Sequence, residues 1–425
     1  MKELAPSSAI PLCYYASAHA ALAAAFLALV IDPSLPGASF YHPRMIALVH
    51  LVTLGWLTAS ILGSFYIVGP LALRVPMVTG PADWVAFTGF TSGTIGMVAQ
   101  FWTNSYDGMA WSAILVFTAV AFVGARAWRG LAASIAPWPV GLHVSLAFFN
   151  MLAAAVLGIL IGFDRTRGVL GLSPLGMMLA HAHLAAVGWV VMMVVGLSYR
   201  LIPMILPAAM PTGASLALSA ILLEGGLVVL VVALLRGSSF VWCGALLIVA
   251  GLASFVTRIR LMVARRLPRP PALPPRDWST WQTHAAFVWL LVTAALGLAL
   301  SVGVPDEHRL TTMWIYGGAG LLGFLAQIVV GMQGRLVPLY AWYRAFASKG
   351  APPDVAANAL PRASFARAIF LLWTAGVPLL TWGLPTENHV AITLGAALLF
   401  AGVLTGGAYV AHMLIRARGG PRPNP

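Results

Sequence analysis

The sequence predicts an all-α polytopic membrane protein with twelve transmembrane helices in three pseudo-repeated four-helix arcs. Composition, the distribution of charge and an internal repeat lead to this prediction. The 425-residue chain is 60% hydrophobic and only 8% charged, whereas soluble domains carry about 25% charged residues. We therefore expect a single transmembrane domain over residues 1–425.

Apolar runs of about 20 residues are the signal of membrane-spanning helices, and the chain contains twelve of them. The first run follows a short polar start and lacks a small-residue cleavage site, so we expect it to be retained rather than removed as a signal peptide. The twelve runs cover residues 10–31, 45–70, 84–103, 110–126, 140–163, 175–203, 213–235, 239–257, 281–303, 311–338, 364–383 and 389–414.

The net charge of +13 follows the expected membrane topology. With the N-terminus placed in the cytoplasm, 19 of the 24 Lys and Arg residues fall on the cytoplasmic side. This positive-inside pattern predicts an integral membrane protein, of the bacterial inner membrane, with both termini cytoplasmic. The basic charge thus indicates anionic lipid of the bilayer as a partner and no nucleic acid.

A repeated motif links the second and sixth predicted spans. Residues 45–70 read MIALVHLVTLGWLTASILGSFYIVGP, and residues 179–203 read LAHAHLAAVGWVVMMVVGLSYRLIP. A weaker third copy, at a further offset of 135, ends at Pro338 and has Gly318 in place of the histidine. We expect repeat units near 1–134, 135–272 and 273–425. At a constant offset of 133, the first two copies match His50 with His183, Gly55 with Gly188, Trp56 with Trp189, Gly63 with Gly196, Tyr66 with Tyr199, and Pro70 with Pro203.

The histidines are the unusual feature of this motif, because imidazoles are costly to bury in lipid. His181 and His183 point about 200° apart on one helix, so they serve two sites, or one of them only packs. His50 and His183 lie at depths that differ by about 5 Å, and we predict that they hold a haem iron from opposite sides. The alternative is that both are core histidines hydrogen-bonded between helices.

Other residues of the motif are consistent with a haem. Gly55 and Gly188 would let a flat macrocycle lie close to the backbone, and Trp56 and Trp189 would offer it aromatic surface. Arg44, near the outer membrane edge, would meet the haem propionates. The repeated glycines and tryptophans could instead serve helix packing alone.

Three segments resemble a known family. AHAHLAAVGWVVMMVVGLSYRLIP resembles the haem-ligand helix of haem–copper oxidase catalytic subunits, most closely subunit I of the cbb3 type. RMIALVH is similar to the second-helix segment of that family, and WIYGGAGLLGFL is similar to a helix that supplies a copper ligand. Twelve spans in three arcs also fit that fold.

The resemblance implies that His50 and His183 are the axial ligands of a low-spin haem b, and that His181 faces a second haem. One haem b is expected and a second is left open. Gly318 stands where the family has a copper-ligating histidine, and the chain has no adjacent His-His pair, so copper is not expected. Tyr316 is either a residue of the distal pocket or an ordinary interfacial tyrosine.

The leading functional hypothesis is electron transfer, or reduction of a small diatomic such as NO or O2, with other respiratory or cytochrome subunits as electron donors. As an enzyme, it would be an oxidoreductase of the haem–copper oxidase or nitric oxide reductase type. One alternative is an NnrS-like haem protein for nitric oxide tolerance, although Leu184 follows His183 where that family has Glu. The other is a non-haem transporter or assembly factor. The roles of four residues stay open: Glu224, His19, His143 and His284.

Overall fold

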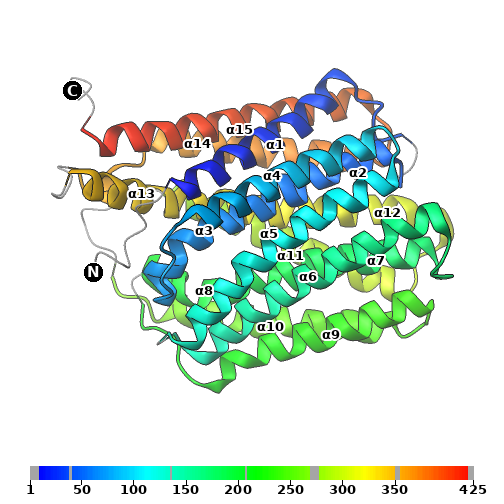
Figure 1. The fold of residues 1–425 in the computed structure, drawn as a ribbon, viewed down its shortest axis with the longest axis horizontal. Coiled ribbons are helices and arrows are strands. Elements are labelled where there is room, and N and C mark those ends of the chain that lie inside the picture. Colours follow the sequence, from blue (N-terminus) through cyan, green and yellow to red (C-terminus); the bar gives the residue numbers. More distant parts are fainter. Residues whose placement is uncertain are drawn as a thin grey trace.

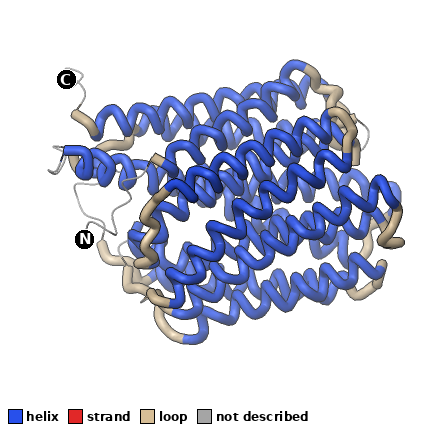
Figure 2. The backbone as a smooth tube through the Cα atoms, in the orientation of Figure 1, coloured by secondary structure: helices blue, strands red, loops and turns tan. Residues whose placement is uncertain are grey.

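The computed structural model describes residues 9–37, 41–134, 136–205, 208–268, 277–349 and 355–419. Within these ranges every regular element is a helix, and the long helices lie side by side in one bundle (Figures 1 and 2). In chain order the elements are α1 Ile10–Ile31, α2 Pro43–His50, η2 Leu51–Thr58, α3 Ala59–Val68, η3 Gly69–Leu73, α4 Pro81–Trp102, α5 Tyr106–Ala132, α6 Trp138–Arg167, α7 Pro174–His183, η4 Leu184–Val191, α8 Met192–Ile205, η5 Ala214–Leu216, α9 Ala217–Arg236, α10 Val241–Ala264, α11 Trp278–Val302, α12 Asp306–Gly318, η6 Ala319–Ala326, α13 Gln327–Lys349, η7 Ala357–Ala359, α14 Ala363–Gly383 and α15 His389–Ala417.

The predicted all-helical membrane fold is confirmed. In the described ranges, eleven helical stretches are long and apolar enough to cross a membrane. The run predicted at 84–103 forms α4, which is not one of the eleven because Asp83, Gln100 and several Gly and Thr residues make it less apolar. The count of twelve spans therefore stays a prediction.

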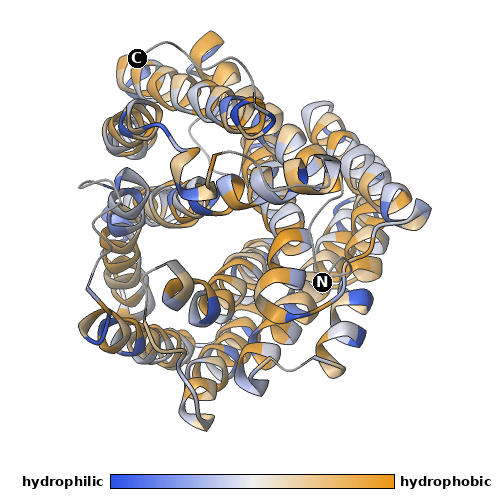
Figure 3. Cartoon of the chain, turned by 90° about the vertical axis from the view of Figure 1, so that its left-hand side faces the viewer, coloured by the Kyte–Doolittle hydropathy of each residue, from blue (hydrophilic) through white to orange (hydrophobic). Residues whose placement is uncertain are grey.

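Apolar side chains also cover the outside of the bundle. Seen along the helices, hydrophobic residues predominate on most of the helices (Figure 3). Large apolar side chains such as Trp111, Phe149 and Leu291 are more than 60% exposed to the surroundings. A surface of this kind suits contact with lipid rather than with water, since large exposed apolar patches are rare on soluble proteins.

Three of the long helices are interrupted by π-helical segments of eight residues each. The segments η2, η4 and η6 begin directly after His50, His183 and Gly318, respectively. Their positions in the chain differ by 133 and 135 residues, which are the offsets found by aligning the sequence. Such π segments inside α-helices are frequent at functional sites. The grouping of the chain into three four-helix units stays a prediction.

The glycine at the middle of each π segment marks a close helix crossing. A Cβ atom added at Gly55 would lie 2.5 Å from the Cβ atom of Ala21 in α1, and one added at Gly188 would lie 2.6 Å from that of Asn150 in α6. Carbon atoms in contact are normally about 3.5–4.0 Å apart. These glycines therefore let helices approach, as the packing alternative predicts, and their role beside a macrocycle stays a prediction.

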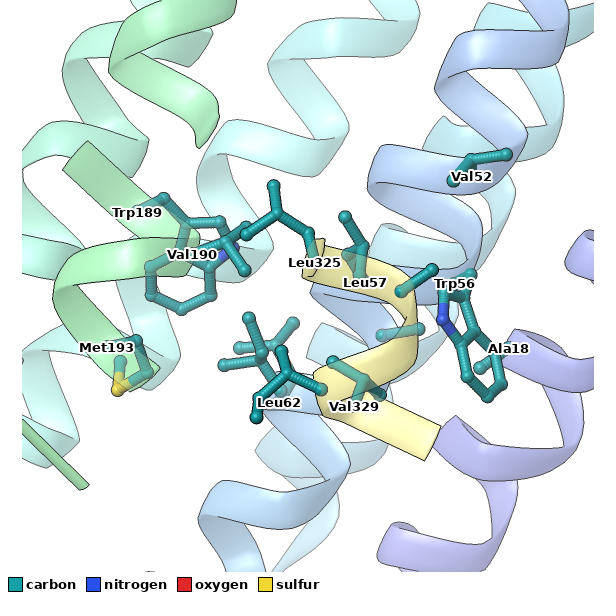
Figure 4. Packing of buried hydrophobic residues seen from close by; sticks show 14 of the residues in the cluster. Ala18, Val52, Trp56, Leu57, Leu62, Trp189, Val190, Met193, Leu325 and Val329 are labelled. Carbon is teal, nitrogen blue, oxygen red and sulfur yellow. The ribbon is translucent and has the colours of Figure 1, made fainter. Parts of the chain in front are cut away.

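The three π segments meet at the centre of the bundle. Figure 4 shows Leu57, Val190 and Leu325, one from each segment, converging on one apolar cluster. A polar contact crosses the same region, because the indole Nε1 of Trp189 donates a hydrogen bond to Thr58 Oγ1 at 3.2 Å. The repeated helices thus form the core around which the others pack.

A buried carboxylate joins α4 to its neighbours at the end of the bundle where α4 begins. Asp83, 2% exposed, accepts a hydrogen bond of 2.7 Å from the Tyr66 hydroxyl and forms an ion pair with Arg126 of α5. The repeat partner of Tyr66, Tyr199, has a 2.9 Å hydrogen bond to Ser219 Oγ of α9. Both repeated tyrosines therefore connect one helix to another.

Candidate functional site

Two of the predicted ligand histidines face each other between α2 and α7. The ring centroids of His50 and His181 are 6.3 Å apart, and the ring planes are inclined by only 23°. Both side chains lie within the bundle but keep some accessible surface. The sequence had paired His50 with His183 instead. The repeat identifies residues in equivalent positions, and equivalent positions on two helices need not face each other. The ligand pair His50 and His183 therefore stays a prediction.

The backbone fixes the orientation of both rings. His50 Nδ1 lies 2.8 Å from the Ile46 carbonyl oxygen, and His181 Nδ1 lies 2.9 Å from that of Ala154 in α6. A carbonyl oxygen only accepts hydrogen bonds, so each Nδ1 carries the proton and each Nε2 has a free lone pair. In the part of the chain that the structure describes, neither Nε2 atom has a hydrogen-bond partner.

The separation of the two ring centroids is compatible with two imidazoles on opposite sides of one metal ion. A metal–imidazole bond is about 2 Å long, and a ring nitrogen lies roughly 1 Å from its ring centroid, so two imidazoles on opposite sides of one ion have centroids about 6 Å apart. The observed separation is 6.3 Å. No group of three or more His, Cys, Asp or Glu gathers anywhere in the described residues, this pair included. A macrocycle that supplies the equatorial ligands would complete the coordination of the His50–His181 pair.

His183 faces a different partner, the tyrosine of α12. Its Nδ1 lies 2.8 Å from the Leu179 carbonyl oxygen, and its Nε2 accepts a hydrogen bond of 3.1 Å from the Tyr316 hydroxyl. Two atoms bound on opposite sides of one metal ion are about 4 Å apart. A metal ion therefore does not fit between His183 and Tyr316 unless the tyrosine retreats by about 1 Å.

The two facing pairs occupy equivalent positions of the repeat. An offset of 133 leads from His50 to His183, and an offset of 135 leads from His181 to Tyr316. The geometry is also alike, because the second pair has a centroid separation of 6.1 Å and an interplanar angle of 24°. His181 and His183 thus lie at two different interhelical positions. This agrees with the interpretation that the two histidines serve two sites.

Glycines in the preceding helix accompany both pairs. A Cβ atom added at Gly158 of α6 would lie 3.0 Å from the His181 ring, and one added at Gly297 of α11 would lie 3.1 Å from the Tyr316 ring. At each pair, the glycine of the preceding helix lets that helix pass close to one ring, which is His181 in the first pair and Tyr316 in the second. The two facing pairs are therefore alike also in the helix that packs beside them, α6 for the first pair and α11 for the second.

The third equivalent position contains no ligand. An offset of 135 from His183 leads to Gly318, and an offset of 133 back from His181 leads to Leu48 on the first repeated helix. Gly318 packs against Thr381 of α14, whose methyl carbon would lie 2.9 Å from an added Cβ atom. Leu48 is 3% exposed and belongs to the apolar core.

The other residues predicted for the haem pocket contact different partners. Trp56 and Trp189 are 2% and 1% exposed and belong to the core. The ring of Trp56 contacts that of His19 edge-on, with 5.1 Å between the ring centroids. Arg44 is exposed in the first turn of α2, with its guanidinium 5.6 Å from the Trp102 ring centroid. Both tryptophans are thus packed in the core, and their place in a haem pocket stays a prediction.

Phe101 is the residue beside His50 that the sequence did not indicate. Its ring centroid, at the end of α4, lies 4.9 Å from that of His50. The carbonyl of Ala154, which orients His181, was likewise not anticipated. A phenylalanine or a backbone carbonyl within an apolar run has no sequence signal that sets it apart.

Two further polar residues inside predicted spans have hydrogen-bond partners. Glu224 is half-buried and accepts a 2.7 Å hydrogen bond from the Asn150 amide. His143 is fully buried, with Nδ1 2.6 Å from the Pro139 carbonyl oxygen and Nε2 3.0 Å from Ser219 Oγ. Both nitrogens of His143 are thus engaged by the protein, which indicates a structural role.

Comparison with known proteins adds no relative to this picture. No protein-family model matches the chain, and no curated protein matches it in sequence. The functional interpretation therefore depends on the geometry of the facing pairs and on the sequence motifs.

Proposed function

We propose that this protein is an integral membrane haem b protein in which His50 and His181 are the two axial ligands of one low-spin haem, and that it transfers electrons. The observation that carries the proposal is the facing pair of imidazoles, 6.3 Å apart and nearly parallel, each with a free Nε2 atom. A bound haem would supply a one-electron carrier at this point.

The protein contributes the orientation and basicity of the two ligands. Each Nδ1–H donates to a backbone carbonyl, which fixes the tautomer and makes Nε2 a stronger ligand. Ile46 belongs to the same helix as His50, whereas Ala154 belongs to α6, so the His181 ring is held by a neighbouring helix. If both imidazoles held the iron of a haem, no position would stay open for a substrate, so such a site would favour electron transfer.

We further propose a relationship to the catalytic subunits of haem–copper oxidases, with twelve spans in three arcs. The offsets of the three π segments support three units. The beginning of α1 and the end of α15 lie at the same end of the bundle (Figure 1), and an even number of crossings, with α4 as the twelfth, explains this. The charge distribution supports cytoplasmic termini in a bacterial inner membrane, and other respiratory subunits would be the electron donors.

A second haem on His183, and with it the reduction of NO or O2, requires a change at Tyr316. The only remaining histidine of the motif has its Nε2 atom in a hydrogen bond to that hydroxyl. Copper has no ligand at the third equivalent position, where Gly318 and Leu48 stand. These contacts favour one bis-histidine haem and electron transfer over catalysis at a second centre.

The test is the visible spectrum and haem content of the purified full-length chain, produced in haem-replete cells. We expect about one haem b per chain, with the sharp α-band of a low-spin, six-coordinate iron in the reduced protein. A chain without a Soret band would overturn the proposal. If that haem-free chain lost a transport activity on Glu224→Gln substitution, the transporter alternative would take its place.

A further inference from the structure

A small cavity lies between α3, α8 and α13, the three helices that follow the π segments η2, η4 and η6. It encloses about 60 Å³ of accessible space. One water molecule needs roughly 10–15 Å³ of such space. The cavity therefore has room for a diatomic molecule, but not for an organic ring or a lipid chain.

The lining of this cavity follows the internal repeat. Twelve of its thirteen described lining residues form four sets of three, whose members are separated by the repeat offsets of 133 and 135 residues. The set that begins at Ser60 continues with Met193 and Ile328. The other three sets begin at Ile61, Ser64 and Val68. The cavity therefore lies where the same face of each repeated helix meets the other two.

The cavity is long and narrow. On α3 the lining runs from Ser60 to Val68, which corresponds to about 12 Å along the helix. One end borders the apolar cluster at the centre of the bundle, to which Met193 and Val329 of the lining belong (Figure 4). A cavity of this shape and volume suits a slender molecule rather than a bulky one.

The walls of the cavity are almost entirely apolar. None of the described lining residues is charged, and the polar ones are Ser60, Ser64 and Ser198. Gln333 Nε2 donates a 3.2 Å hydrogen bond to Ser60 Oγ, and Ser64 Oγ shares one of 2.9 Å with the Tyr15 hydroxyl. The Ser198 hydroxyl can bond the carbonyl oxygen one turn back in its own helix. Buried water requires roughly two to four polar partners, so these walls favour a cavity without water.

We infer that this cavity binds an uncharged, apolar diatomic gas, the class to which O2 belongs. Apolar cavities without water bind small apolar ligands such as xenon. A diatomic gas has no charge that needs a partner, and it gains dispersion contacts with the walls, which include the polarisable thioethers of Met193 and Met332. None of the motif histidines lines the cavity, so the inference goes beyond the proposed electron transfer and does not depend on a haem.

The experiment uses the paramagnetism of dissolved O2, which broadens NMR signals of nearby methyl groups and falls off steeply with distance. The full-length chain, with isotope-labelled methionine methyl groups, is measured in phospholipid nanodiscs under N2 and under O2, with any haem kept oxidised. Met193 lines the cavity and is 1% exposed, whereas its neighbour Met192 does not line it and is 0% exposed. We expect O2 to broaden the Met193 signal severalfold more than the Met192 signal. Met204, 45% exposed, reports the gas dissolved in lipid.

A cavity-filling variant provides the second arm of the test. Val194→Phe places a larger side chain in the cavity, so the broadening at Met193 should be lost while that at Met204 remains. The substitutions Met192→Leu and Met193→Leu assign the two buried signals. Equal broadening of these signals, a Met193 signal insensitive to O2, or undiminished broadening in Val194→Phe would overturn the inference. If Val194→Phe does not fold, the comparison of Met193 with Met192 in the unsubstituted chain decides alone.

Discussion

Replacing His181 and His183 one at a time distinguishes the facing pair from the repeat-equivalent pair. His181→Ala removes an imidazole whose ring centroid is 6.3 Å from that of His50, close to the roughly 6 Å expected for two imidazoles on one metal ion. Loss of a residue that merely supports a metal ligand typically costs 10- to 100-fold in affinity. We expect His181→Ala to cost at least about this much in haem retention.

His183→Ala should leave the haem in place. It removes the 3.1 Å hydrogen bond from Tyr316 and the 2.8 Å hydrogen bond to the Leu179 carbonyl oxygen, so the expected cost is about 1–3 kcal/mol of folding free energy. The assay is the ratio of haem to protein after purification, together with the spin state from the reduced spectrum. Added imidazole should restore a low-spin spectrum to His181→Ala by entering the vacated space. Loss of haem from His183→Ala, with full retention in His181→Ala, would refute the reasoning.

Three further substitutions test the surroundings of the site through thermal unfolding and spectra of the purified chain. Gly188→Ala should destabilise the fold by about 1–3 kcal/mol, because the new Cβ would lie 2.6 Å from a neighbouring helix, whereas Gly225→Ala, with open space around it, should be close to neutral; equal effects would contradict the packing role. Asp83→Asn should cost about 3–5 kcal/mol, since it leaves the Arg126 guanidinium without its buried partner, and an unchanged melting temperature would argue against this ion pair. Tyr316→Phe should preserve the low-spin spectrum and cost about 1 kcal/mol; a changed axial ligation in this variant would show that the tyrosine contacts the iron.

Hydropathy was sufficient to predict the helices, and the offsets of the repeat were sufficient to predict the spacing of the three π-helical segments η2, η4 and η6. Each of the twelve apolar runs corresponds to a helix, because burying backbone polar groups in an apolar environment leaves few alternatives to a helix. The offsets between His50, His183 and Gly318 recur as the spacing of the π segments. The sequence did not indicate that these segments are π-helical, since the three runs read as ordinary apolar helix.

The partner of each histidine could not be predicted in the same way. An alignment shows that His50 and His183 are equivalent, but contact depends on how two helices are rotated about their axes. That rotation is set by crossings such as the one at Gly188, which involves a residue from another part of the sequence. The same limit applies to Trp56 and Trp189, whose burial in the core depends on neighbouring helices rather than on their own segments.

The near-identity of the two facing pairs also has a genetic consequence. Tyrosine and histidine codons differ in a single base at the first position. The pair of His183 and Tyr316, with its 6.1 Å centroid separation, is therefore one point mutation away from two facing imidazoles. In a gene built from repeats of this kind, the number of bis-imidazole positions can change by single-base steps while the helices that hold them stay the same.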